Sequence, residues 1–254
     1  FTLTAVTDQR RSEPAQARIS IYRDAATPAD LLRGNVVRGN VVTYLDGVPE
    51  AAHASGSAGI FVHGARGFTV ADNTVQRPLA DGIHVTAASR EGRIVNNRVR
   101  DAGDDLIAMV SYLGAGWQAR MRSDAVFAAA ATAGELQVSQ VVVQGNDVAD
   151  NYWGRGISVV GSRDITVRDN VVERTTYGAG LLVAQEGGYN TFGPRNVLFL
   201  DNVVRDVQTT RPTWLPVGPS FTWLHDLWAA GGPRTGHGAL EVHAIQNNAN
   251  DVGD

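Results

Sequence analysis

Three aspartates in two similar turns have the residue type and the spacing that acid and base chemistry needs. Asp81 precedes a glycine, and Asp104 and Asp105 follow as a pair, with Asp105 placed 24 residues after Asp81. Carboxyl groups that lie close together raise one another's pKa, so one can stay protonated while a neighbour is ionised. One protonated acid beside one carboxylate base is what cleavage of a glycosidic bond requires. The three side chains therefore indicate hydrolytic chemistry, provided that the fold brings them together.

A repeat along the chain would position these turns. Its pattern is an apolar residue, two residues of any type, an asparagine, one residue of any type and a second apolar residue. It occurs six times, with its asparagines at Asn40, Asn73, Asn97, Asn146, Asn170 and Asn202. The recurrent spacing of 24 residues is interpreted as one coil, and the longer spacings as coils with insertions or longer loops. We interpret each asparagine as a turn residue that tolerates left-handed backbone and whose amide bonds to the next coil.

A second track of short segments runs between the asparagine turns. Each segment has a turn residue followed by alternating apolar residues, as in a half-buried strand. The segments span residues 59–62, 82–85, 105–109, 156–159, 180–183 and 238–242. Such units bury their apolar faces only by stacking on one another. Because adjacent coils of a parallel stack lie about 4.8 Å apart, Asp81, Asp105 and Arg155 are predicted to form a ladder, with the other aspartate beside it.

The repeat and the two strand tracks together resemble the right-handed parallel β-helix of the pectate-lyase-like superfamily. The resemblance implies an all-β fold, a single-stranded right-handed parallel β-helix, with repeats over about residues 33–245 of a single domain, 1–254. Residues 1–32 show no clear repeat and are expected to form an irregular first coil or a cap. Two insertions interrupt the period, an alanine-rich one at about 112–136 that suits a short helix and a tryptophan-rich one at about 208–236. Insertions in solenoids tend to lie on one face, often the binding face.

The turns that hold the aspartates are similar to the motifs of polygalacturonase-like glycoside hydrolases. Those enzymes carry Asp-Gly on one coil, Gly-Asp-Asp on the next and Gly-His-Gly on the third. The corresponding segments here are Asp81-Gly82, Gly103-Asp104-Asp105 and Gly154-Arg155-Gly156, with arginine in place of the histidine. The resemblance implies that Asp104 protonates the leaving oxygen, that Asp81 and Asp105 hold and activate water, and that the configuration is inverted. Arg155 is then a charge-stabilising or substrate-binding group, and no cofactor or metal ion is expected.

The resemblance also bears on the substrate. The chain has no lysine, so the Arg-x-Lys motif that would hold a uronate is absent. The related α-1,3-glucanase and dextranase families carry three aspartates on the same scaffold and act on neutral glucans. A neutral glucan is therefore favoured over pectin. The C5-epimerases on this scaffold resemble the chain less, because their Asp-Pro-His signature is absent.

Two other interpretations use the same residues differently. Aspartate clusters suit Ca²⁺, and β-helix pectate and alginate lyases combine such a site with an arginine base. In that alternative Asp81, Asp104 and Asp105 would bind Ca²⁺. Arg155 would then be the base that acts on a uronic-acid polymer. The third interpretation is a non-catalytic solenoid that only binds glycan.

Aromatic and imidazole side chains near these turns are candidates for substrate binding. Flat apolar rings with polar edges stack on sugar rings. Tyr152 and Trp153 come directly before the third turn and Tyr177 lies in the following coil, so we expect these three to contact sugar. His84 follows the first aspartate by three residues and can point toward the same turns, and His237 lies on the same track further along.

Composition narrows the class of partner. The 254 residues carry 22 basic side chains, all of them arginine, against 26 acidic ones, and the net charge of -4 argues against a nucleic-acid partner. No apolar stretch reaches the length of about 18 residues that a membrane-spanning helix needs. The absence of cysteine excludes disulfides and thiolate chemistry. The expected partner is a polysaccharide or oligosaccharide, and the size of such a substrate predicts a secreted, extracellular or periplasmic protein.

Overall fold

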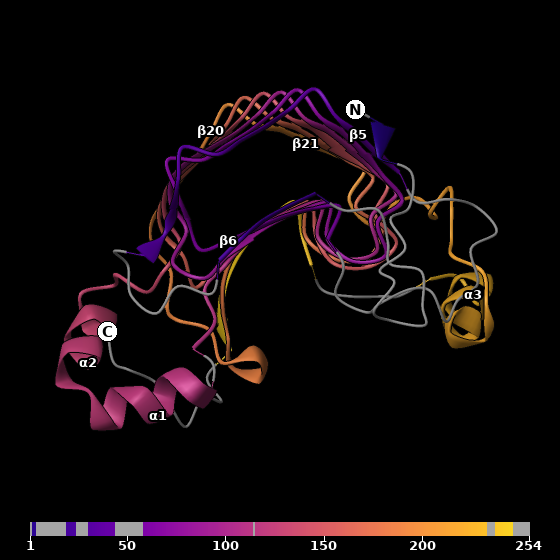
Figure 1. Cartoon of the computed structure of the whole chain (residues 1–254). Helices are drawn as coiled ribbons and strands as arrows, with labels where there is room; N and C mark the ends of the chain where they lie inside the picture. The colour runs from indigo at the N-terminus through magenta and orange to yellow at the C-terminus, as the bar shows by residue number, and fades with distance from the viewer. Residues whose placement is uncertain are drawn as a thin grey trace.

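The computed structural model describes residues 2–3, 19–23, 30–43, 58–113, 115–232 and 237–245. Through these residues the chain winds around three sheets, which successive coils visit in the same order. Figure 1 looks along the stack, so that the coils overlap one behind another. Strands of neighbouring coils pair in parallel in all three sheets, and the parallel β-helix predicted from the repeat is confirmed.

A complete coil contributes strands to all three sheets, and within the described residues a sheet is formed by the corresponding strands of successive coils. The first sheet contains β2 (Ile19–Tyr22), β6 (Ile60–His63), β10 (Ile83–Thr86), β13 (Ile107–Val110), β16 (Ile157–Val160), β19 (Leu181–Glu186) and β22 (Leu240–Ile245). The second contains β3 (Leu32–Arg33), β4 (Val36–Arg38), β7 (Ala65–Arg66), β8 (Thr69–Ala71), β11 (Arg90–Val95), β14 (Ser139–Gln144), β17 (Arg163–Arg168) and β20 (Arg195–Leu200). The third contains β1 (Thr2–Leu3), β5 (Val41–Thr43), β9 (Thr74–Gln76), β12 (Arg98–Arg100), β15 (Asp147–Ala149), β18 (Val171–Glu173) and β21 (Val203–Arg205).

The turn between the second and third sheets is built on the repeated asparagine. Nδ2 of Asn73 donates to Oδ1 of Asn97 over 2.9 Å, and Nδ2 of Asn97 donates to Oδ1 of Asn146 over 2.9 Å. Each amide also donates to a backbone carbonyl of the neighbouring coil, so the predicted ladder is confirmed. The left-handed residue is the one before the asparagine rather than the asparagine itself, and it is an aspartate, asparagine or glycine, as that backbone favours. These residues are Gly39, Asp72, Asn96, Gly145, Asp169 and Asp201.

The inward face of the first sheet fixes how the coils stack. Ile83, Ile107 and Ile157 occupy one register position in β10, β13 and β16, and each is 0% exposed. They belong to a continuous buried cluster that extends from Ile21 to Leu181. Burial of each such side chain contributes about 1.5–3 kcal/mol. A shift of one residue in the pairing of these strands would move the isoleucines to the outward face of the sheet. This core therefore sets the register of the turns that precede the strands.

Two insertions flank the outward face of the first sheet, on opposite sides of it (Figure 1). The first contains two helices, α1 (Ala115–Ser123) and α2 (Ala125–Thr132), where one short helix was expected. Asp124 separates them and caps α2, because its carboxylate accepts two backbone N–H groups of the first turn. The second insertion contains the 3-10 turn η4 (Pro219–Phe221) and the helix α3 (Thr222–Ala229), which the sequence had not indicated.

The chain before residue 33 is more regular than expected where the structure describes it. Ile19 of β2 pairs with Ile60 of β6, so the first sheet begins before the recognisable repeat. The remainder of the expected cap, residues 4–18 and 24–29, lies outside the described residues. Among the described helices, none has the length and apolar character to cross a membrane.

Candidate functional site

The register of the first sheet brings the three aspartates together at the start of its strands. Asp81, Asp105 and Arg155 each lie two residues before the first residue of β10, β13 and β16, respectively. Oδ1 of Asp81 accepts the backbone N–H of Asp105 over 3.0 Å, and Oδ1 of Asp105 accepts that of Arg155 over 2.7 Å. The same contact thus repeats in two successive coils, and the predicted ladder is confirmed.

Asp104 lies beside this ladder in the turn before β13. Burial and the negative charges of Asp105 and Asp81 raise its pKa well above the ordinary value, against an opposing contribution from Arg155. Gly154 packs directly on this carboxyl group, because a Cβ atom there would lie 2.3 Å from Oδ1 of Asp104. Gly154 also has a φ of +64°, which disfavours a side chain at this position. The close packing excludes water from one side of the acid and helps to keep it protonated.

Asp105 is held more firmly than its neighbour. It is 4% exposed, and Oδ2 accepts a hydrogen bond from the hydroxyl of Ser158. Oδ1 accepts the backbone N–H of Arg155, whose Nη1 lies 3.5 Å from the same oxygen. Burial raises the pKa of Asp105, while Arg155 and Ser158 oppose the rise. Burial and the charges of both other aspartates raise the pKa of Asp104 well above its ordinary value, so Asp104 is the member of the pair that we expect to hold a proton.

Arg155 is a paired cation. Its guanidinium contacts Asp105 and also the carboxylate of Glu186, at the end of β19. Burial acts to lower the pKa of Arg155, but the nearby aspartates more than offset this effect and the pKa is raised. Arg155 therefore contributes positive charge to the site and does not supply a proton acceptor.

His84 and Tyr112 lie on the other side of Asp81. Nδ1 of His84 is 2.6 Å from Oδ2 of Asp81, and His84 is only 7% exposed although it faces outward from β10. The ring of Tyr112 is parallel to the imidazole, with centroids 6.2 Å apart. Burial, and then the charges of the aspartates, raise the pKa of Tyr112, so its phenol stays protonated.

One oxygen from each aspartate lies within 4.8 Å of the others. Asp81 and Asp104 are half-buried, so solvent reaches them, whereas Asp105 is buried. A hard cation such as Ca²⁺ prefers oxygen clusters, but here it would compete with protein donors for both oxygens of Asp81 and of Asp105. The three aspartates are therefore better suited to share protons with one another than to bind a calcium ion.

The separation of the carboxyl groups also bears on stereochemistry. Retaining glycosidases place their two carboxyl groups about 5–5.5 Å apart, and inverting enzymes about 6.5–9.5 Å apart. Here one oxygen of each aspartate lies within 4.8 Å of the others, and because a carboxyl group extends beyond its nearest oxygen, the groups themselves are further apart than these atoms. Inversion, which the resemblance implied, stays a prediction for the reaction.

Replacement of Asp105 by asparagine is expected to lower the pKa of Asp104. The substitution removes the negative charge that, after burial, contributes most to the raised pKa, so the pKa of Asp104 should move back toward its ordinary value. Oδ1 of the new amide can still accept the backbone N–H of Arg155, and its Nδ2 can donate to the hydroxyl oxygen of Ser158, so the turn is expected to keep its shape. A titration of the Asp104 carboxyl carbon by NMR in both proteins measures the shift. An unchanged titration would show that Asp105 does not act on the acid.

The predicted aromatic contacts divide into two groups. Trp153 and Tyr177 stack with ring centroids 3.7 Å apart and are half-buried at the edge of the turns. Tyr152 is 4% exposed and packs with Leu224 and Trp228 of α3. Tyr152 therefore anchors the second insertion and presents no open ring face to a sugar, unlike what the sequence had suggested.

His237 lies on the same face as the aspartates but further along the stack. Its Nδ1 contacts one carboxylate oxygen of Glu241, and Nδ1 of His243 contacts the other. Glu241 pairs in register with Leu182, which pairs with Ser158. The strands β16 and β19 thus lie between the coil of His237 and the coil that carries Asp104 and Asp105. Among the described contacts, His237 makes none with the aspartates.

Three contacts of the site were not anticipated from the sequence. Ser158 occupies the outward register position that His84 occupies in β10, so a comparison of that position between coils would have indicated it. Glu186 and Tyr112 lie where strands of the first sheet give way to loops, outside the repeat, and no spacing points to them.

Comparisons with known proteins concern the fold. A family model described as "Right handed beta helix region" matches residues 33–209. No curated protein gives a significant match. A similar solved structure is the Azotobacter vinelandii mannuronan C-5 epimerase AlgE4 A-module, with 14% identity and a TM-score of 0.39 over 82% of this chain. The match spans 58% of that module.

Proposed function

The chain belongs to the right-handed β-helix family, and on this scaffold we propose that it is a glycoside hydrolase that cleaves a polysaccharide by acid and base catalysis. The observation that supports this most is Asp104, a half-buried acid of raised pKa with the carboxylate of Asp81 within 4.8 Å. A protonated carboxyl group and a carboxylate base side by side are the two groups that the reaction needs. We propose no metal ion and no cofactor, and a polymeric substrate outside the cell or in the periplasm.

In the proposed reaction Asp104 is the general acid. Its proton passes to the glycosidic oxygen while the bond between that oxygen and the anomeric carbon breaks. A water molecule attacks the anomeric carbon, and its proton passes to the carboxylate of Asp81. His84 holds that carboxylate in position through Nδ1. Proton exchange with solvent then returns Asp104 to the acid form and Asp81 to the carboxylate form.

Asp105 receives a supporting role in this proposal instead of the water-activating role that the resemblance implied. Asp105 is buried, at 4% exposure, whereas Asp81 is half-buried, so water reaches the carboxylate of Asp81 more readily than that of Asp105. Its charge contributes to the raised pKa of Asp104. Asp105 is therefore proposed to keep the acid protonated at neutral pH.

The calcium-dependent lyase has less support. Its base would be Arg155, yet the raised pKa keeps that guanidinium charged. A uronic-acid substrate would also need a cation to hold its carboxylate, and Arg155 is already paired with Asp105 and Glu186. A neutral glucan remains the proposed substrate class.

A panel of glycans separates the candidate functions. The purified protein is incubated with neutral α- and β-glucans, pectin and alginate, and three quantities are followed: reducing ends, the ultraviolet absorbance of unsaturated ends, and the effect of EDTA. We expect new reducing ends on a neutral glucan, no unsaturated ends, and no loss of activity with EDTA. The Asp104→Asn variant serves as the control for contaminating enzymes.

Other outcomes would overturn this proposal in distinct ways. Unsaturated ends that vanish on chelation would identify a lyase and reassign the three aspartates as calcium ligands. Glycan retention without any new chain ends would identify a binding solenoid.

A further inference from the structure

Trp223 is a large aromatic side chain that α3 leaves half exposed beside the candidate site. It is 51% exposed, and its ring lies 5.1 Å from that of Trp153 at an interplanar angle of 86°. Because the two planes are nearly perpendicular, Trp153 covers at most one face of the Trp223 ring. An exposed indole with an open face is a surface on which a sugar ring can stack.

The attachment of α3 does not depend on this side chain. Leu224 and Trp228, one turn apart on the helix, are buried with Tyr152 in one apolar cluster. Trp214, which precedes the helix, packs on Tyr152 with ring centroids 5.9 Å apart. The second insertion is thus anchored by the buried cluster and does not need Trp223. The ring of Trp223 instead contacts Trp153, which is stacked on Tyr177 of the next coil.

The position of this aromatic surface is fixed relative to the proposed acid. Trp153 directly precedes Gly154, whose backbone packs on the carboxyl group of Asp104. Nδ2 of Asn151 donates to the carbonyl oxygens of Trp153 and of Asp104, which ties the two turns together. A sugar ring bound on Trp223 and Trp153 would therefore belong to the same glycan chain that reaches Asp104.

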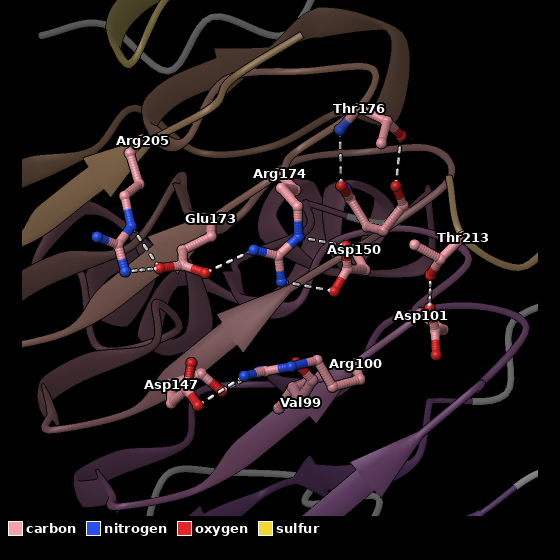
Figure 2. Close-up of polar contacts among 11 residues, drawn as sticks. Val99, Arg100, Asp101, Asp147, Asp150, Glu173, Arg174, Thr176, Arg205 and Thr213 are labelled. Atoms are coloured by element: carbon pink, nitrogen blue, oxygen red, sulfur yellow. Dashed lines mark hydrogen bonds and ion pairs between the residues drawn. The ribbon is translucent and has the colours of Figure 1, made fainter. Parts of the chain in front are cut away.

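The arginines that lie close in sequence to the aromatic residues are paired with carboxylates. Figure 2 shows Arg174 between Asp150 and Glu173, with Nη2 at 2.8 Å from Oδ2 of Asp150 and Nη1 at 2.6 Å from Oε2 of Glu173. Arg205 contacts the same glutamate, and Arg100 is paired with an aspartate of the neighbouring coil. Arg174 precedes Tyr177, the stacking partner of the aromatic surface, by three residues. Arg174, close to Tyr177 in the sequence, and Arg155, two residues after Trp153, are both occupied by carboxylates, so this surface suits an uncharged sugar better than a uronate.

We propose that Trp223 and Trp153 form an aromatic subsite for an uncharged sugar ring of the glycan, adjacent to the bond that is cleaved. This inference rests on the proposed function and adds to it the residues that select the substrate. Trp223 comes from the second insertion rather than from the repeat, so the insertion supplies part of the specificity.

The test measures glycan binding without turnover, in the Asp104→Asn variant. Dissociation constants for neutral and uronic-acid oligosaccharides are compared among this variant and versions that also carry Trp223→Leu, Trp223→Phe or Val217→Ala. Val217 lies in the same insertion and is 71% exposed, so its replacement is the matched control. We expect Trp223→Leu to weaken binding of neutral oligosaccharides roughly tenfold, Trp223→Phe to restore most of it, and Val217→Ala to change nothing. Leucine keeps an apolar contact with Trp153, so the melting temperature should not change.

Failure of the inference and failure of the proposed function give different results. Equal affinity in the Asp104→Asn protein with and without Trp223→Leu overturns the subsite, even if the enzyme cleaves glycan. Preference for uronic-acid oligosaccharides overturns the assignment of an uncharged sugar. Binding of no glycan at all by the Asp104→Asn protein overturns the proposed function, and the subsite with it.

Discussion

Replacement of Asp104 by asparagine is expected to lower kcat by roughly 10²–10⁴-fold. The amide has nearly the same shape as the carboxyl group but carries no proton that it can give to the leaving oxygen. Gly154 packs against Oδ1 of Asp104, and an amide of the same size fits this contact. The loss should therefore appear in kcat with little change in KM.

The same substitution is expected to change how stability depends on pH. A carboxyl group whose pKa is higher in the folded protein than in the unfolded chain favours folding while it is neutral. This contribution to the free energy of unfolding is complete below the pKa of an aspartate in the unfolded chain, about 3.9. It is lost as the pH rises through the pKa of the group in the folded protein. Because the folded pKa of Asp104 is raised, the natural protein should lose melting temperature over this window relative to Asp104→Asn. Thermal melts of both proteins across mildly acidic to neutral pH measure the difference.

Asp201→Asn is a suitable control for both measurements. Asp201 is an exposed turn residue with a φ of 50°, a backbone conformation that asparagine also tolerates. Its replacement should leave kcat and the melting temperature at neutral pH unchanged. Full activity in Asp104→Asn, with the control also active, would show that the proton comes from another group.

The alignment of the aspartate turns was predictable because two signals in the sequence agree on it. The asparagine pattern gives the length of a coil, and the apolar track after each glycine gives the position of the first-sheet strands. Together they place Asp81, Asp105 and Arg155 at one register position, where the backbone contacts of 3.0 and 2.7 Å are found. In a solenoid each coil contacts only its neighbours, so a local pattern is enough to determine contacts between residues far apart in the sequence.

Side chains that reach the site from outside the repeat were not predictable in the same way. Glu186 and Tyr112 lie at loop ends, and their positions follow from contacts such as the bridge between Tyr112 and Thr191 rather than from a period. Tyr152 was expected to face a sugar because, like Trp153, it comes directly before the third turn, but adjacent residues can point in opposite directions. The helix α3 covers Tyr152 and leaves Trp153 half-buried, and no pattern in the sequence indicates that helix.

The asparagine ladder should be the most sensitive part of the fold. Asn146 is 1% exposed, and its Nδ2 donates to the carbonyl of Ile94 and to Oδ1 of Asn170, over 3.0 and 2.9 Å. Its Oδ1 accepts both the backbone N–H and Nδ2 of Asn97, over 2.9 Å each. Replacement by alanine would leave buried donors and acceptors of the two neighbouring coils without hydrogen-bond partners, and each such group costs about 1–3 kcal/mol.

We therefore expect Asn146→Ala to lower the free energy of unfolding by about 3 kcal/mol or more, which chemical denaturation measures from the shift of the midpoint. The matched control is Asn35→Ala, at a partly exposed residue whose Nδ2 makes a single 3.3 Å bond to the carbonyl of Arg33. It should cost less than about 1 kcal/mol. Similar losses in both variants would mean that the amide ladder adds little beyond the surrounding strands. A large loss only in Asn146→Ala would instead show that the side chain holds adjacent coils in register, and that this register, on which the aspartate cluster depends, is stabilised from the far side of the coil.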